Sequence, residues 1–300
     1  MPTDKFNIPF LYASKPNGFF YQQSDNPKND SNFDPPSSFT YDGGGVSTMH
    51  VSGPTDFGIL KDTNFQDCIG GCNMDFSDTA SRGYANKSSD PRDCEYKMLV
   101  SIENGGSGHG LSISGPTGHH ASNSSPCCQG FAYMASMEYD DNPTQFRFRK
   151  EMWHVSYHDS PEGFWTHPAV NFRVNNHGWV GVGYVRYNKK DGISAGKDSV
   201  VLELWFNPTP TTNLNNWIML KRIEDKHGWG DDGDQCGGNK DQVGTWSSAQ
   251  WRTKSNDDSC DVHVKCITLR EIDPTLSFDD TPDIPPEPPS SGGTTTISGT

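Results

Sequence analysis

The sequence predicts an all-β protein, a single β-sandwich or jelly roll with long loops, and three observations support this fold class. All eight tryptophans lie between Trp153 and Trp251. Within that window, aromatic and β-branched residues alternate with polar ones along 146–157, 179–187 and 200–206. This period of two is typical of strands with one buried face. The 31 glycines and 21 prolines lie mostly in the long connections between such segments.

The composition divides the chain into three segments. Residues 1–45 are rich in proline, asparagine and glycine, so we expect an irregular N-terminal arm packed on the domain, with short strand pieces at 9–12 and 19–21. Residues 46–273 carry the strand patterns and form the predicted jelly-roll domain. Residues 274–300 are rich in Pro, Ser, Thr and Gly and cannot bury a core. We interpret them as a linker or tail that leads to a further domain.

The strands of the domain are expected in two groups. In the first group, 97–102 and 131–135 are the clearest strands, and the Gly-, Ser- and His-rich stretch 105–130 is expected to be a long loop or loose hairpin. Loops of that length inside a compact domain are usually functional or disordered. The second group ends in a strand that alternates over 260–272. The apolar spacing of 215–224 suits a helix and a strand, and we interpret it as a strand.

The charge balance excludes several classes of partner. The formal net charge is −14, and no Lys/Arg cluster is longer than Arg147–Lys150, whereas a nucleic-acid-binding surface needs a basic patch. Acidic charge also disfavours anionic membrane surfaces, and no apolar run is long enough to span a bilayer, so we expect no membrane insertion. Because salt screens charges beyond roughly 8–10 Å, a local basic cleft can still bind an acidic polymer.

The cysteine count predicts disulfides. An even number of cysteines in a loop-rich chain indicates an oxidising compartment and hence secretion, which three Asn-x-Ser sequons at Asn29, Asn86 and Asn123 also suit. A zinc site is the alternative, but none of the spacings has the tight Cys-x2-Cys form. The cysteines are Cys68, Cys72, Cys94, Cys127, Cys128, Cys236, Cys260 and Cys266.

One disulfide pairing is expected from the position of the cysteines in loops beside aromatic strands. We expect Cys236 to pair with Cys127 or Cys128. The two adjacent cysteines are expected to serve two different bridges, because a bond between neighbours is strained.

The strand pattern resembles that of concanavalin A-like jelly rolls. A strand at 179–188 is followed by Val200–Asn207, whose Glu-Leu-Trp-Phe-Asn ending is similar to a strand of lectin domains, glucanases and polysaccharide lyases. The stretch from Val182 also resembles a strand of alginate-lyase-type enzymes, in which a tyrosine transfers a proton beside the sugar. Tyr187 and Asn188 match that motif, whereas glycine replaces its lysine, and the family's Arg-x-Glu-x-Arg strand has only a scrambled relative here. The resemblance, to alginate- and glucuronan-lyase-like secreted microbial proteins, implies contact with a polysaccharide.

Such chemistry defines the candidate residues. β-Elimination of a uronate polymer needs a group that neutralises the carboxylate, a base for the C5 proton and an acid for the leaving oxygen, and His and Tyr are the usual proton carriers. On a strand, Trp153, Val155 and Tyr157 make the better core row, so we expect His154 to face the cleft. The catalytic candidates are His154, Tyr187, His119, His120 and Arg149, and the substrate-binding candidates are Arg147, Asn188, Trp165, Trp229, Trp246 and Trp251.

Each candidate has a structural alternative. A single histidine on a strand is more often a hydrogen-bonded structural residue than a catalyst, and the two arginines suit solvated strand positions equally. Trp179, Trp205 and Trp217 are expected in the core. The better candidates for a sugar platform lie among Gly, Ser and Asp, and they are Trp165, Trp229, Trp246 and Trp251.

The sequence requires no cofactor, but one loop suits a structural calcium ion. Hard cations prefer oxygen ligands, and residues 228–241 concentrate the aspartates Asp231, Asp232 and Asp234. A solvated, disulfide-pinned loop is the alternative. His154 and His158 cannot share a metal on a strand, because four residues span about 13 Å there.

These observations predict a secreted, carbohydrate-active protein whose partner is a polysaccharide. The first hypothesis is a lyase that cleaves a uronate-containing polymer by β-elimination. The alternatives are a non-catalytic glycan-binding module, and a structural component of a cell surface or extracellular filament. A retaining glycosidase is weaker, because it needs two carboxyl groups about 5–5.5 Å apart and Glu203 has no evident partner in the sequence.

Overall fold

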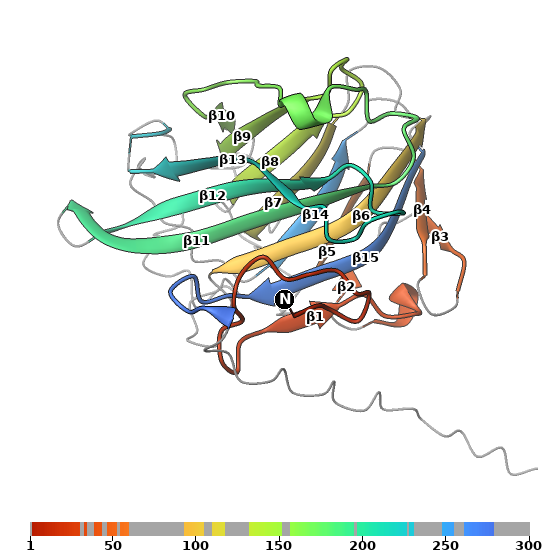
Figure 1. The fold of residues 1–300 in the computed structure, drawn as a ribbon, viewed down its shortest axis with the longest axis horizontal. Helices are drawn as coiled ribbons and strands as arrows, with labels where there is room; N and C mark the ends of the chain where they lie inside the picture. The colour runs from red at the N-terminus through yellow and green to blue at the C-terminus, as the bar shows by residue number, and fades with distance from the viewer. Residues whose placement is uncertain are drawn as a thin grey trace, which may run out of the picture.

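The fold consists of two antiparallel β-sheets packed face to face as a sandwich, which confirms the predicted fold class (Figure 1). Among the described residues, two short 3-10 helices, η1 (Pro27–Asn29) and η4 (Pro168–Val170), accompany the strands. No helix in the part of the chain that is described is long and apolar enough to cross a membrane. The computed structural model describes residues 2–30, 33–34, 39–43, 47–52, 55–59, 93–104, 110–117, 132–151, 157–194, 197–226, 228–230, 248–254 and 261–278.

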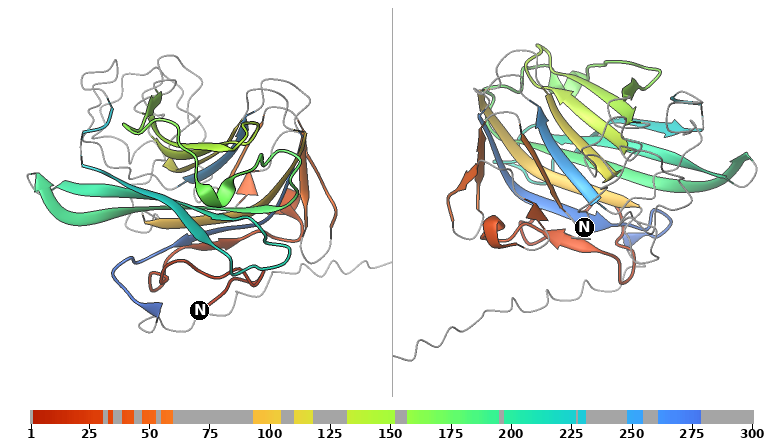
Figure 2. Two further views of the ribbon diagram at one scale, coloured as in Figure 1. Left: turned by 45° about the horizontal axis from the view of Figure 1, so that its top comes forward. Right: turned by 180° about the vertical axis from the view of Figure 1, so that it is seen from behind.

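The first layer is an eight-stranded sheet with the order β13-β12-β11-β6-β15-β4-β3, in which β1 also pairs with β15. Figure 2 shows this layer and the opposite one from two further sides. The strands of the first layer are β1 (Phe20–Gln22), β3 (Phe39–Tyr41), β4 (Met49–Ser52), β6 (Cys94–Asn104), β11 (Val180–Ser194), β12 (Lys197–Asn207), β13 (Ile218–Asp225) and β15 (Asp261–Glu271).

The second layer is a seven-stranded sheet with the order β10-β9-β8-β7-β14-β5-β2. Its strands are β2 (Phe33–Asp34), β5 (Thr55–Ile59), β7 (Gly110–Thr117), β8 (Ala132–Glu138), β9 (Gln145–Glu151), β10 (Tyr157–Asp159) and β14 (Ser248–Lys254).

Period-two alternation divides the side chains of each strand between the core and an outer face. In β9, Phe146 and Phe148 belong to the main apolar cluster between the sheets, so Arg147 and Arg149 point away from it. In β15, Val262 and Val264 are core residues in the same way. Burial of such side chains contributes about 1.5–3 kcal/mol each, which makes this cluster the main source of stability.

Strand β6 is buried on both faces from Cys94 to Ile102, because the N-terminal arm covers the outer face of the eight-stranded sheet. Tyr96 and Met98 point into the sandwich. Glu95 and Lys97 alternate with them and point to the outer face, yet each is only 1% exposed. Charges buried to this extent need partners.

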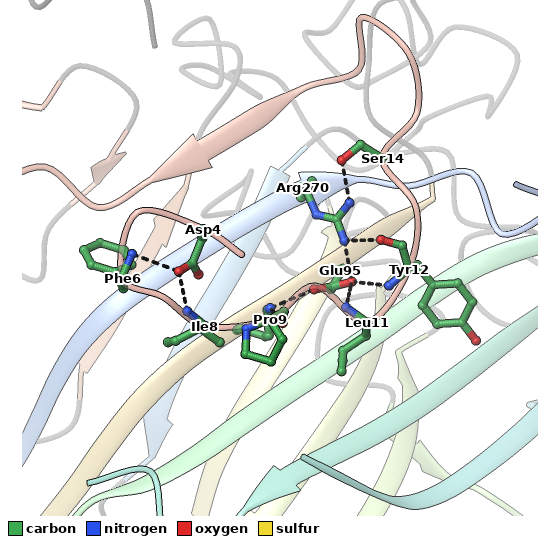
Figure 3. Close-up of polar contacts among 10 residues, drawn as sticks. Asp4, Phe6, Ile8, Pro9, Leu11, Tyr12, Ser14, Glu95 and Arg270 are labelled. Atoms are coloured by element: carbon green, nitrogen blue, oxygen red, sulfur yellow. Dashed lines mark hydrogen bonds and ion pairs between the residues drawn. The ribbon is translucent and has the colours of Figure 1, made fainter. Parts of the chain in front are cut away.

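The buried charges bind the main chain of the arm (Figure 3). Oε2 of Glu95 accepts hydrogen bonds from the backbone N–H groups of Leu11 and Tyr12, both 3.0 Å, and from Arg270 at 2.7 Å. Its Oε1 lies 3.0 Å from Nζ of Lys97. Lys97 also donates to the carbonyl of Pro9. Burial alone would raise the pKa of Glu95, but the charges of Arg270 and Lys97 outweigh it and hold that pKa below its usual value.

Apolar side chains of the arm fill the space around these charges. The ring of Phe10 lies 4.0 Å from the Arg270 guanidinium and 5.4 Å from Nζ of Lys97. Ile8 packs with Leu99 and Cys266 in a separate small cluster. The arm is therefore an integral part of this face of the sandwich.

Some elements differ from those expected. The stretch 105–130 contains β7, in which Leu111 and Ile113 are core residues. Intervening glycine and serine residues hide this alternation in the sequence. In the first 45 residues, the expected strand piece at 19–21 is β1, whereas 9–12 forms no strand and β2 and β3 were not expected. The ambiguous segment 215–224 is strand β13 from Ile218 onward.

The disulfide interpretation is wrong for Cys94 and Cys266, which are buried free thiols. Burial raises the pKa of the Cys266 thiol to about 12, so it stays protonated and unreactive near neutral pH. The six other cysteines, among them Cys128 and Cys236, lie outside the described residues.

We predict that Glu95→Gln lowers the free energy of unfolding by about 3–5 kcal/mol, because it leaves Arg270 and Lys97 as buried charges without their counter-ion. Chemical denaturation measures the change. The matched control is Lys15→Ala, since Lys15 is 45% exposed in its pair with Glu271 and should contribute no more than about 1 kcal/mol. Equal losses in the two variants would show that the Glu95 cluster does not anchor the arm.

Candidate functional site

Five strands of the seven-stranded sheet begin or finish in one row at the same end of the sheet. The register pairs Ala132 with both Thr117 and Glu151, Glu151 with Tyr157, and Thr117 with Ser248. Thr117 and Glu151 are the last residues of β7 and β9, whereas Ala132, Tyr157 and Ser248 are the first of β8, β10 and β14. We call this row the loop end, because the chain enters or leaves the sheet at each of these residues.

Many of the residues singled out in the sequence belong to segments that border the loop end. These segments are 118–131 between β7 and β8, 152–156 between β9 and β10, and 231–247 before β14. The side chain of Trp251 is not described, so its role as a sugar platform stays a prediction. The residues of these segments lie outside the described ranges, and the catalytic, substrate-binding, calcium and disulfide roles expected of them also stay predictions. The candidate residues in these segments are His119, His120, Cys128, His154, Asp231, Asp232, Asp234, Cys236 and Trp246.

Arg147 and Arg149 share the outer face of β9 next to the loop end. Their Cα atoms are about 6.6 Å apart, given the rise of a strand. Arg147 lies 2.9 Å from Glu138 and 3.4 Å from Asp159, and Nε of Arg149 lies 3.2 Å from Asp159. The two arginine side chains are 17% and 19% exposed. On this face, two cations therefore share two carboxylates.

Each of these arginines lies over an aromatic ring. The guanidinium of Arg147 is 4.3 Å from the ring centre of Phe164, and that of Arg149 is 4.8 Å from Tyr157. Phe164 is 47% exposed, so a solvent-exposed apolar ring lies beside the charged guanidinium of Arg147. Nε of Arg147 is buried and has no hydrogen-bond partner among the described residues. Burial and then the charge of Arg147 lower the pKa of Arg149, which means that an added anion would stabilise this pair.

A buried ion pair lies on the opposite, inward face of the same strand. Nζ of Lys150 donates to Asp225 at 2.8 Å and to the carbonyl of Trp229 at 3.0 Å. The hydroxyl of Tyr133 donates to the same Asp225 oxygen at 2.6 Å. Lys150 and Asp225 are 0% and 2% exposed. Because Asp225 is the last residue of β13, this contact joins the two sheets.

The environment keeps Tyr133 protonated as a donor. Burial, followed by the charge of Asp225, raises the pKa of Tyr133 well above its usual value. Sequence reasoning missed this cluster, although one signal was available. The alternation that puts Phe146 and Phe148 inward also puts Lys150 inward, and a lysine in an apolar row indicates a buried partner.

Two of the tryptophans considered as sugar platforms pack against the core. Trp229 is 5% exposed, and its ring meets Tyr133 edge to face at 5.7 Å. Trp165 stacks on Phe146 at 5.2 Å and remains partly exposed, with Nζ of Lys221 5.3 Å from its ring. Phe164, which the sequence did not single out, is the exposed ring of this region.

Tyr187 and Asn188 lie on β11 in the other sheet, so the structure does not bring them together with Arg149. Tyr187 points to the outer face that carries the arm, and its hydroxyl accepts a hydrogen bond from Arg222 at 2.7 Å. The Asn188 side chain accepts one from Arg186 at 2.9 Å. The thickness of the sandwich therefore separates Tyr187 from the arginine pair.

Glu203, which lacks an evident partner in the sequence, is enclosed by partners in the structure. It accepts hydrogen bonds from the hydroxyl of Tyr12 at 2.7 Å and from Nε1 of Trp205 at 2.8 Å. Nη1 of Arg222 lies 3.6 Å from Oε1, the same oxygen that accepts the hydrogen bond from Tyr12. A carboxylate so completely engaged is suited to holding the arm and Arg222 in place.

Comparison with known proteins yields no matching family model and no matching curated protein. Among solved structures, the chain is similar to a carbohydrate-binding module from Bacillus subtilis, with 8% identity over 81% of this chain and 97% of that chain and a TM-score of 0.37. It is also similar to a GlcNAcα1-4Gal-releasing endo-β-galactosidase from Clostridium perfringens, with 9% identity over 92% and 67% of the two chains and a TM-score of 0.43. Similarity at this level carries no argument about function, which must rest on the site itself.

We predict that Asp225→Asn lowers the free energy of unfolding by about 3–5 kcal/mol, because Lys150 then remains buried without a counter-ion. Tyr133→Phe removes one hydrogen bond to a charged group and should cost about 1.5–3 kcal/mol. Urea denaturation measures both. Glu162→Gln is the control, because Glu162 is 46% exposed in its pair with Lys221. If Asp225→Asn is as stable as this control, the ion pair does not hold the sheets together.

Proposed function

We propose that this chain is a secreted carbohydrate-binding protein that holds a uronate-containing polysaccharide against the outer face of the seven-stranded sheet, beside the loop end. One observation carries the proposal. Arg147 and Arg149 stand on the same face of β9, each with its guanidinium over an aromatic ring. A polymer with regularly placed carboxylates and sugar rings presents both kinds of group that such a surface binds.

The arginines are suited to carboxylate recognition. A guanidinium donates two parallel hydrogen bonds to a carboxylate, and this geometry is both strong and specific. In the free protein the two arginines form ion pairs with Glu138 and Asp159, and the Asp159 side chain is 39% exposed. Exposed pairs contribute only about 0–1 kcal/mol. A carboxylate of the polymer can therefore replace Asp159 at little cost.

Phe164 supplies the apolar part of the surface. Its ring is 47% exposed and lies beside Arg147. The C–H groups of a sugar ring give it an apolar face, and packing that face on Phe164 removes apolar area from water on both sides. The combination of one ring and two cations accounts for selection of acidic over neutral polymers.

The overall charge of the chain sets a condition on this binding. With a net charge of −14, the protein repels a polyanion at long range, so affinity must come from contacts within the local cationic row. Those contacts are partly exposed and are screened by salt. Binding to an acidic polymer should therefore weaken as ionic strength rises.

We predict that Arg147→Ala and Arg149→Ala each weaken binding of a uronate polymer by about tenfold or more, since a hydrogen-bonded charged group contributes about 1.5–3 kcal/mol. Affinity electrophoresis and calorimetry with alginate, glucuronan and pectate measure the effect. Arg222→Ala is the matched control, because Arg222 lies on the outer face of the other sheet. Wild-type protein that binds none of these polymers, or an equal loss in the control, contradicts the proposal.

Catalysis by β-elimination is the second candidate function, and one observation favours it. Tyr157 lies over Arg149, so a phenol stands beside a cation that can neutralise a substrate carboxylate, as this reaction needs. Rising absorbance at 235 nm with a uronate polymer would report the unsaturated product, and Tyr157→Phe would then abolish it. A flat trace from protein that still binds the polymer leaves the chain as a binding protein.

A further inference from the structure

Two histidines face each other across neighbouring strands of the eight-stranded sheet, far along the chain from the arginine pair. The register of β4 and β15 places His50 directly opposite His263, and their ring centres are 4.2 Å apart. Met49, Val51, Val262 and Val264 are core residues, so both histidines point to the outer face by alternation. Their side chains are 33% and 21% exposed, which leaves them accessible to a solute.

Each histidine is held by a carboxylate at the same ring nitrogen. Nε2 of His50 lies 2.8 Å from Asp42, and Nε2 of His263 lies 3.2 Å from Asp261. Such a carboxylate favours the tautomer with the proton on Nε2, in which Nδ1 carries the lone pair that a metal ion needs. Histidines that bind metal ions in proteins have this arrangement, with a carboxylate on the nitrogen that is not a ligand.

We propose that His50 and His263 form a binding site for a transition-metal ion of the Cu²⁺ or Zn²⁺ class, with the two Nδ1 atoms as ligands. Imidazole nitrogens suit these ions, which bind them at about 2.0–2.1 Å. Directly opposed residues of an antiparallel pair have Cβ atoms about 4.5–5.5 Å apart, so both rings can reach one ion. Calcium and magnesium prefer oxygen ligands and are not expected here.

Glu103 is the third group of the site. Its Oε1 lies 3.9 Å from Nδ1 of His263 and accepts a hydrogen bond from Ser101 at 2.6 Å. Glu103 is 49% exposed, so its side chain can rotate toward an ion. Within the described ranges no three His, Cys, Asp or Glu side chains already converge as a ligand set, and therefore the ion binds two imidazoles first and draws in Glu103 and water.

The local charge favours a cation. Asp42, Glu103 and Asp261 surround the histidine pair, and this part of the sheet faces away from the seven-stranded sheet. The site is therefore independent of the proposed polysaccharide contact, which lies on the opposite layer of the sandwich.

The experiment titrates tag-free, full-length protein with Cu²⁺ and separately with Zn²⁺, by calorimetry and by electron paramagnetic resonance for copper. His50→Ala and His263→Ala should each remove one binding event and the nitrogen hyperfine pattern of a second imidazole. Asp42→Asn should weaken binding by about tenfold or more, because outer-shell carboxylates contribute to that extent. Ca²⁺ should not compete.

His177→Ala is the control variant, because His177 lies outside this pair. Its ring stacks on that of Phe172, with the two ring centres 3.9 Å apart. Its titration should match that of the wild type, which shows that loss of a histidine elsewhere in the chain does not by itself remove binding. Wild-type protein that binds neither ion overturns the proposal. So does binding that is unchanged in both His50→Ala and His263→Ala.

Discussion

The buried ion pair between Lys150 and Asp225 is the constraint on which the arrangement of the candidate site depends. It joins β9 of one sheet to the end of β13 in the other, and Tyr133 completes the coordination of the carboxylate. A strand has a side-chain period of two, so fixing Lys150 inward fixes Arg149 outward. A slip of one residue would bury the arginines and expose Phe146 and Phe148. A buried pair that is costly to break thus sets the face on which the two arginines stand.

A second set of buried charges determines which part of the chain covers the outer face of the eight-stranded sheet. Glu95, Lys97 and Arg270 project from β6 and β15, and they bind mainly the main chain of the arm, while Arg270 also donates to the Ser14 hydroxyl. The docked arm places the Tyr12 hydroxyl where it donates a hydrogen bond to Glu203. The same carboxylate also accepts a hydrogen bond from Nε1 of Trp205. The arm therefore occupies the face on which Tyr187 lies. The two outer faces differ as a result, since one is covered by the chain itself and the other presents arginines and an exposed ring.

Much of the fold could be predicted from the sequence, because period-two alternation is a local property. It identified the strands that became β9, β11, β12 and β15. It failed for β7, where glycine and serine dilute the pattern. The candidate site could be predicted only in part from the sequence, for a different reason. Alternation says which residues share a face, but not which sheet a strand joins, so Tyr187 and Arg149 could be grouped in sequence although they lie on opposite layers. The partner of Lys150 comes from the other sheet, seventy-five residues away in sequence, and no local pattern reveals such a pair.

The most direct test of the central claim is to observe the arginine side chains while an acidic oligosaccharide binds. In ¹⁵N-labelled protein, the Nε–Hε signals of Arg147, Arg149 and Arg222 can be assigned by substituting each arginine with lysine in turn. Titration with a uronate oligosaccharide should shift the Arg147 and Arg149 signals in a saturable manner and leave Arg222 unchanged. Saturable shifts of Arg222, with Arg147 and Arg149 unmoved, would place the ligand on the outer face of the eight-stranded sheet and contradict the account.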